Sequence, residues 1–147
     1  MPKIRHIAVH TPDVEKTAEF YKKAFDMVEV GRTDSPLAEG IYLSDGYINL
    51  AVLTFRSVEA ADRHDGLGPV MGLHHFGFAV ENAEETRKKL AEAGAEYREQ
   101  RLPTNMTGYF EEKYKGPESV MIDISQHGWI YEPRPERQPA GTGAGTS

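Results

Sequence analysis

The sequence contains no cysteine among its 147 residues. Disulfide bonds, thiolate metal ligands and cysteine nucleophiles are therefore excluded, and a reducing cytoplasm is the expected location. No run of about 18 apolar residues occurs and no signal-peptide pattern opens the chain, so we expect no membrane span. An excess of basic residues is also missing, since the formal net charge is −6. This balance argues against a nucleic-acid surface and leaves a small molecule as the expected partner.

The stretch Leu73–Val80 has the composition of a strand, with apolar, aromatic and β-branched residues. Alternation along a strand places His75, Gly77 and Ala79 on one face. The small residues on that face leave room in front of the His75 imidazole, which a ligand site needs. His74 is expected on the other, mostly apolar face, pointing away from His75.

A similar stretch occurs earlier in the chain. Aligning His75 with His6 sets an offset of 69 residues (75 − 6), and Arg5–Val9 then matches His74–Phe78. Self-similarity at a fixed offset indicates an internally duplicated domain. The two halves would present equivalent histidines.

Each half is predicted to have the order βαβββ, which makes the fold class α+β. Asp13 and Asn82 are favoured N-cap residues for the two helices, and Asp45-Gly46 is a strong hairpin signal. The modules are expected to span 4–55 and 73–125, with a connector at 56–72, inside one domain at 1–137. Residues 138–147, rich in Gly, Thr and Ala, are expected to be disordered. The expected strands are 5–11, 27–31, 41–44, 47–55, 73–80, 96–101, 108–114 and 120–125, with a loop at 32–40.

Asp123 is the third residue that carries chemistry. It interrupts an otherwise apolar strand, where a carboxylate is costly unless it is paired or bound to a metal. Two histidines and one carboxylate facing a common cavity form the facial triad of non-haem Fe(II) sites. Mn, Zn, Ni or Co remain alternatives, because ligand type alone does not fix the metal. In the structural alternative, His6 and His75 are hydrogen-bonded core residues and Asp123 pairs with a lysine or arginine.

Other polar and aromatic residues are candidates for the surroundings of this centre. His10 shares a strand face with His6 and either lines the cavity or is solvated at the strand end. With a nearby glutamate, it is a weak candidate for the catalytic base that a lyase or isomerase needs. Tyr109 and Tyr114 are candidate catalytic or cavity-lining residues, although aromatics near strand ends are more often packing residues. His127 and Trp129 follow the last strand and are candidates for the pocket rim.

These residues together resemble the vicinal oxygen chelate superfamily, which contains glyoxalase I, methylmalonyl-CoA epimerase, extradiol dioxygenases, and bleomycin and fosfomycin resistance proteins. His6-Ile7-Ala8-Val9 with Asp13 resembles the family's opening motif, and His75-Phe76-Gly77-Phe78 resembles its second opening. The segment from Tyr114 to Asp123 resembles the closing motif, with Asp123 where the metal-binding glutamate normally stands. The resemblance implies two tandem modules forming a curved mixed sheet around a metal cavity, commonly in a homodimer.

The sequence departs from the family pattern at two points that bear on function. The position of the fourth glyoxalase ligand is assigned to Asn49, a weak metal ligand, which we expect to stay outside the metal's ligand sphere. The segment Leu102–Lys113 lacks the histidine that extradiol dioxygenases use.

Three classes of function remain open. The favoured one is a metal-dependent enzyme on a small substrate with vicinal oxygens, slightly favouring an Fe(II) dioxygenase-like oxidoreductase. The alternatives are a glyoxalase- or epimerase-type lyase or isomerase, and a non-catalytic binding protein of the resistance type.

Overall fold

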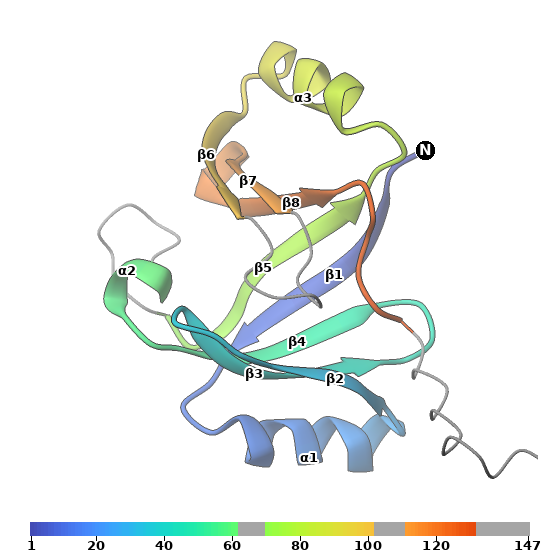
Figure 1. Cartoon of the computed structure of the whole chain (residues 1–147), viewed down its shortest axis with the longest axis vertical. Helices are drawn as coiled ribbons and strands as arrows, with labels where there is room; N and C mark the ends of the chain where they lie inside the picture. The colour runs from blue at the N-terminus through green and yellow to red at the C-terminus, as the bar shows by residue number, and fades with distance from the viewer. Residues whose placement is uncertain (62–69, 102–110, 132–147) are drawn as a thin grey trace, which may run out of the picture.

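The computed structural model describes residues 1–61, 70–101 and 111–131. Within them the chain forms one eight-stranded sheet, in the order β2-β3-β4-β1-β5-β8-β7-β6, with two longer helices, α1 and α3 (Figure 1). This confirms the predicted α+β class and the curved mixed sheet. The elements are β1 (Lys3–His10), α1 (Val14–Phe25), β2 (Val28–Asp34), β3 (Ala38–Ser44), β4 (Asn49–Phe55), α2 (Val58–Ala61), β5 (Gly72–Ala79), α3 (Ala83–Glu92), β6 (Glu96–Arg101), β7 (Glu111–Lys115), the 3-10 turn η1 (Pro117–Ser119) and β8 (Met121–Ser125).

Local sequence signals set the ends of both helices. The Asp13 carboxylate accepts a hydrogen bond from the backbone N–H of Lys16, and the Asn82 side chain does the same for Glu85. Both residues are extended N-caps, as predicted. None of the helices in the described ranges is long and apolar enough to cross a membrane.

The first-half strands differ from the prediction at the β2–β3 connection. The expected loop at 32–40 is reduced to three residues, because β2 continues to Asp34 and β3 begins at Ala38. Ser35 closes this turn by donating its backbone N–H to Ala38 O and accepting the Leu37 N–H at Oγ. The β2 strand lies at the sheet edge, where its polar residues stay solvated, so hydrophobic patterning did not reveal it.

The pairing register reproduces the duplication. The antiparallel pair of β1 and β5 lies at the centre of the sheet, with His6 opposite Gly77 and Ala8 opposite His75. Since Gly77 is 69 residues after Ala8, and His75 is 69 after His6, each pairing is the image of the other under a twofold axis between the strands. β4 and β8 then pair in parallel with the outer sides of β1 and β5.

The two helices cover one face of the sheet. In the first half, the apolar residues of α1 pack on β1, β3 and β4 in a buried cluster of Val9, Val14, Ala18, Ile41, Leu43, Leu50 and Val52. In the second half, Leu90 of α3 packs against a smaller cluster of Val80, Tyr114 and Ile124. Residues that alternate with these, such as Ala8 and Ala51, point to the uncovered face. We call this opposite face the site face.

Several sequence predictions fall outside the described residues. They are the tail at 138–147, residues 62–69 of the connector and the first part, 108–110, of the strand predicted at 108–114.

Candidate metal centre

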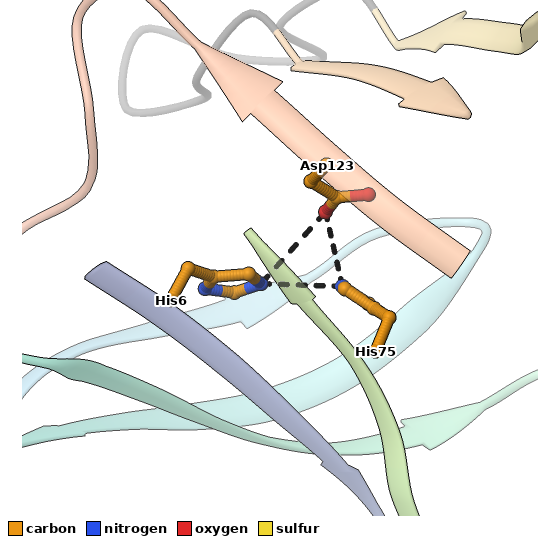
Figure 2. Close-up of side chains that lie close together, drawn as sticks. All are labelled: His6, His75 and Asp123. Carbon is orange, nitrogen blue, oxygen red and sulfur yellow. Dashed lines mark hydrogen bonds and ion pairs between the residues drawn. The ribbon is translucent and has the colours of Figure 1, made fainter. Parts of the chain in front are cut away.

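Three neighbouring central strands each contribute one side chain to a cluster on the site face. His6 comes from β1, His75 from β5 and Asp123 from β8, and Figure 2 shows the three pointing toward one another. Gly77 pairs with both His6 and Asp123, so these two side chains lie in one row on either side of a residue that has none. The absence of a side chain at the middle position lets the outer two approach.

The three candidate ligand atoms are close and buried. His6 Nε2 lies 3.2 Å from His75 Nε2, and Asp123 Oδ2 lies 3.0 Å from His75 Nε2 and 3.9 Å from His6 Nε2. Exposure is 3% for His6, 8% for His75 and 0% for Asp123. Three atoms bound at right angles, about 2.1 Å from one ion, would be about 3.0 Å apart. The two separations from His75 Nε2 come close to this value, whereas the 3.9 Å between Asp123 Oδ2 and His6 Nε2 would have to shorten for a facial set.

Asp123 Oδ2 is the clearest sign that something belongs among these atoms. It is buried and accepts no well-aligned hydrogen bond, although His75 Nε2 is within ion-pair distance. A buried carboxylate oxygen without a hydrogen bond is costly, and a metal ion is one of the few partners that satisfies it. Within the described residues, this is the one group of three or more His, Cys, Asp or Glu side chains arranged to hold an ion.

The charge states suit ligation. Burial lowers the pKa of His75 to about 4, despite the opposing attraction of Asp123. Burial alone would raise the pKa of Asp123, but the positive charges of Lys113 and, at low pH, of protonated His75 hold this pKa below its usual value. At neutral pH the cluster therefore contains a neutral His75 and an ionised carboxylate, the forms that bind metals.

Asn49 sets the proton position on His6. The Asn49 amide nitrogen donates to Ile130 O at 2.9 Å, so its Oδ1 faces His6 Nδ1 at 3.0 Å and accepts the N–H there. In the tautomer that makes this hydrogen bond, the His6 lone pair lies on Nε2, the atom that faces His75. Asn49 is therefore placed on the far side of the imidazole from the cluster.

The register also corrects the assignment of the fourth position. Ala51 pairs with Ala8, just as Asp123 pairs with Gly77, the equivalent of Ala8. The residue equivalent to Asp123 is thus Ala51, and not Asn49, which pairs with His6. A methyl group cannot ligate a metal. The β-pairing register, unlike the sequence offset, accounts for the different loop lengths of the halves.

His74 lies beside His75 instead of pointing away from it, so that expectation was wrong. His74 Nδ1 lies 2.7 Å from His75 Nδ1. Ala8 pairs with His75 and Val9 with Leu73, which makes His74 the extra residue of a β-bulge. A bulge interrupts the alternation of side chains on which the expectation relied.

A buried lysine pairs with Asp123, as the structural alternative expected, although the sequence did not identify which lysine. Lys113 pairs with Asp123 across β7 and β8, and its Nζ lies 2.6 Å from Asp123 Oδ1 and 3.7 Å from Glu111 Oε2. One carboxylate oxygen is thus engaged by lysine while the other faces the histidines. Counting the register back from the short turn at residues 116–120 would have placed Lys113 opposite Asp123.

Trp129 fills the space that small residues were expected to leave open. Its indole stacks on the His6 ring at 4.6 Å between centroids and 7° between planes, and its Nε1 donates to Glu111 Oε1 at 2.7 Å. A Cβ on Gly77 would lie 2.8 Å from the Trp129 ring. The glycine therefore makes room for this tryptophan, which forms one wall of the cluster.

The other candidates are placed apart from the cluster or lie outside the described residues. His10 is buried with its Nδ1 3.3 Å from Val70 O, and its ring lies against Phe55. Tyr114 is on the face covered by α3, where its hydroxyl donates to Glu112, and burial raises its pKa to about 12. His127 is exposed after β8. Tyr109 belongs to the undescribed segment 102–110.

Comparison with known proteins agrees with this architecture. The family model described as Glyoxalase/Bleomycin resistance protein/Dioxygenase superfamily matches residues 3–124. No curated protein matches the sequence.

Solved structures share the fold at low sequence identity. A hypothetical protein from Bacillus halodurans C-125 superposes with a TM-score of 0.67 at 20% identity, covering 84% of this chain and 93% of the other. A methylmalonyl-CoA epimerase in complex with methylmalonyl-CoA and NH4+ gives 0.65 at 17% identity, with 84% and 93% covered. The methylmalonyl-CoA epimerase from Mycobacterium tuberculosis gives 0.65 at 15% identity, with 90% and 88% covered.

Proposed function

Because the chain belongs to the Glyoxalase/Bleomycin resistance protein/Dioxygenase superfamily, we propose that it is a metal-dependent enzyme acting on a small molecule with vicinal oxygens. His6, His75 and Asp123 are the proposed ligands of one divalent cation. The observation that carries the proposal is Asp123 Oδ2, a buried carboxylate oxygen that accepts no well-aligned hydrogen bond and faces two imidazole Nε2 atoms.

Fe(II) is the favoured metal, since two histidines and one carboxylate with open positions are typical of non-haem Fe(II) oxygenases. Mn, Zn, Ni and Co remain alternatives. When bound, such an ion supplies Lewis-acid stabilisation of negative charge on a substrate oxygen and, if it is Fe(II), reactivity toward dioxygen.

The residues around the centre support a set of three protein ligands. Ala51 stands where a fourth carboxylate would be, and Asn49 is engaged by His6 Nδ1 and Ile130 O. Lys113 holds Asp123 Oδ1, which favours ligation through Oδ2 alone. An octahedral ion would keep three positions for other groups, enough for a bidentate substrate and dioxygen. This count supports a dioxygenase-like reaction.

The protein residues would orient the substrate and shield it from water. Trp129 covers one side of His6, and its stacking leaves the imidazole little freedom to rotate. Lys113 is a buried ammonium beside the carboxylate ligand, well placed to donate a hydrogen bond to a substrate oxygen that becomes negative during the reaction.

A lyase or isomerase is the second candidate, and Lys113 is the observation that favours it. Reactions of that class need a side chain that moves a proton at the substrate carbon or oxygen. Lys113 and Glu111 are ionisable groups in contact with each other and adjacent to the proposed ligand Asp123. The shared fold with methylmalonyl-CoA epimerases is compatible with this reading.

Loading the metal-free protein with different metals under anaerobic conditions separates the candidate functions. The metal-free protein is charged with Fe(II), or with Ni(II) or Co(II), and supplied with vicinal diols, enediols and hydroxyketones in an oxygen electrode. The dioxygenase proposal expects oxygen uptake with Fe(II) alone, and its loss in Asp123→Asn. Turnover with Ni(II) or Co(II) and without oxygen uptake identifies a lyase or isomerase. Tight substrate binding without metal or turnover identifies a non-catalytic binding protein.

The resemblance also supports a homodimer in the cytoplasm as the working assembly and location. Light scattering measures the mass of the protein in solution and so tests the homodimer. A mass equal to that of one chain would refute it.

A further inference from the structure

His74 lies at a bulge of β5, directly beside the proposed ligand His75. It is the extra residue of the β5 bulge, and the bulge brings its side chain to the same side as that of His75. The side chain is buried, with 6% exposure. Two of its hydrogen-bond partners are the backbone oxygen of Ala61 and Nδ1 of His75.

Donor and acceptor rules assign the protons along these contacts. His74 Nε2 lies 2.7 Å from Ala61 O, and a carbonyl oxygen only accepts, so this nitrogen carries a hydrogen. In its neutral form the His74 imidazole has one N–H, which leaves Nδ1 as an acceptor. His75 Nδ1, 2.7 Å away, is then the donor. The His75 lone pair consequently lies on Nε2, the atom facing His6 and Asp123.

We propose that His74 is a positioning residue that fixes His75 in the tautomer able to bind a metal through Nε2. The inference rests on the proposed metal-binding role of His75. Without the His74 acceptor, the Nδ1–H of a buried His75 loses its partner. The tautomer with its hydrogen on Nε2 then becomes preferred, because that hydrogen points toward the Asp123 carboxylate. In this tautomer, His75 Nε2 has no lone pair with which to bind a metal.

The first half of the molecule fixes its histidine by other means. Asn49, anchored on Ile130 O, holds the Nδ1–H of His6. Arg5, the residue equivalent to His74 (74 − 69 = 5), lies at the matching bulge of β1 but donates to Tyr47 O. The His74 arrangement is therefore particular to the second half and does not follow from the duplication.

Packing is the structural alternative, since the His74 ring also lies 4.5 Å from the Phe55 ring and 6.2 Å from that of His10. Two variants separate the roles. His74→Phe keeps an aromatic ring but removes the acceptor. His74→Asn loses ring packing but places an amide oxygen near the position of Nδ1. His127→Phe, at an exposed histidine, serves as the control.

The first measurement uses metal-free protein, with imidazole nitrogen NMR at neutral pH to read the tautomer of His75. The wild type is expected to show hydrogen on Nδ1, and His74→Phe to shift the population to Nε2–H. A wild-type His75 with its hydrogen on Nε2 overturns the inference, whatever the variants do.

The second measurement is metal affinity, followed by Ni(II) quenching of the fluorescence of Trp129, the one tryptophan of the chain. Outer hydrogen-bond partners of metal-binding histidines typically contribute about 10- to 100-fold to affinity. We expect a loss of that size in His74→Phe, substantial recovery in His74→Asn, and no change in His127→Phe. If the wild type binds Ni(II) and His74→Phe binds it equally well, the inference fails. If the wild type binds no metal, the proposed function fails, while the NMR result still reports on His74.

Discussion

Lys113 Nζ lies 2.6 Å from Asp123 Oδ1, and both side chains are buried on the site face of the sheet. The pair places a positive charge beside the carboxylate whose second oxygen is offered to the histidines. The metal-free protein therefore has a partner for the Asp123 charge, and a bound cation would share that carboxylate with Lys113.

We predict that Lys113→Met destabilises the metal-free protein by about 3–5 kcal/mol, because it leaves a buried carboxylate without its counter-charge. A divalent metal would supply the missing positive charge, so Ni(II) should raise the melting temperature more in this variant than in the wild type. Thermal unfolding with and without Ni(II) measures both effects. Lys88→Met, at an exposed position of α3, is the matched control. An equal Ni(II) shift in Lys113→Met and the wild type would refute the prediction.

Gly77→Ala should displace Trp129. The added methyl would lie 2.8 Å from the indole and 3.1 Å from Asp123 Cβ, in a region without spare space. We expect a loss of about 1–3 kcal/mol in stability and a red-shifted tryptophan emission as the indole becomes wetter. Gly31→Ala, whose methyl would meet Tyr42 at an ordinary 3.4 Å, should leave the emission unchanged. Unchanged emission in Gly77→Ala would contradict the stacked position of Trp129.

The stability of the metal-free protein should fall as pH decreases from about 6.5 to 4. Burial lowers the pKa of His75 from 6.5 to about 4, so the unfolded chain takes up a proton at a higher pH than the folded one. The unfolded state thus binds more protons in this window, so the free energy of unfolding falls as the pH falls and rises as the pH rises. Urea unfolding in the presence of a chelator measures this slope. It should be shallower in His75→Gln and retained in His127→Gln, and a flat wild-type profile would count against a buried neutral His75.

Ala51→Asp tests the three-ligand arrangement. By register it places a carboxylate at the equivalent of Asp123, so we expect tighter Ni(II) binding and a metal-free protein that is less stable because the new charge is buried. Any Fe(II)-dependent oxygen uptake should decrease, since one open position is lost. Ni(II) affinity and oxygen uptake are the two measurements. Unchanged affinity in a folded variant would mean that Ala51 does not face the metal position.

The fold could be predicted from the sequence because the features that specify it are local and occur in both halves of the chain. Asp13 and Asn82 mark the helix starts, and the 69-residue offset between His6 and His75 predicts two equivalent modules. The same offset brought the two histidines to a common strand pair, where the register confirms their equivalence.

What the sequence did not reveal depends on irregular or long-range structure. The bulge at His74 breaks the alternation that predicted its direction. The family resemblance assigned the fourth position to Asn49, whereas the strand register places Ala51 there. The contact of Trp129 with His6 joins a segment that follows the last strand to the first strand, and no periodic pattern encodes it. The bulge, the fourth position and Trp129 are neighbours of the proposed ligands and not ligands themselves. The three proposed ligands could therefore be chosen from the sequence without them.

The most direct test of the account is metal stoichiometry in paired samples of wild type and Asp123→Asn. The asparagine variant keeps the shape of the side chain while removing the charge of the oxygen that accepts no well-aligned hydrogen bond. Metal-free protein is loaded with Fe(II) or Ni(II), freed of excess ion and analysed by elemental mass spectrometry, with circular dichroism to verify the fold. The account predicts about one ion per chain in the wild type and a loss of most of it in folded Asp123→Asn. Equal metal content in the two proteins, or none in the wild type, would contradict it.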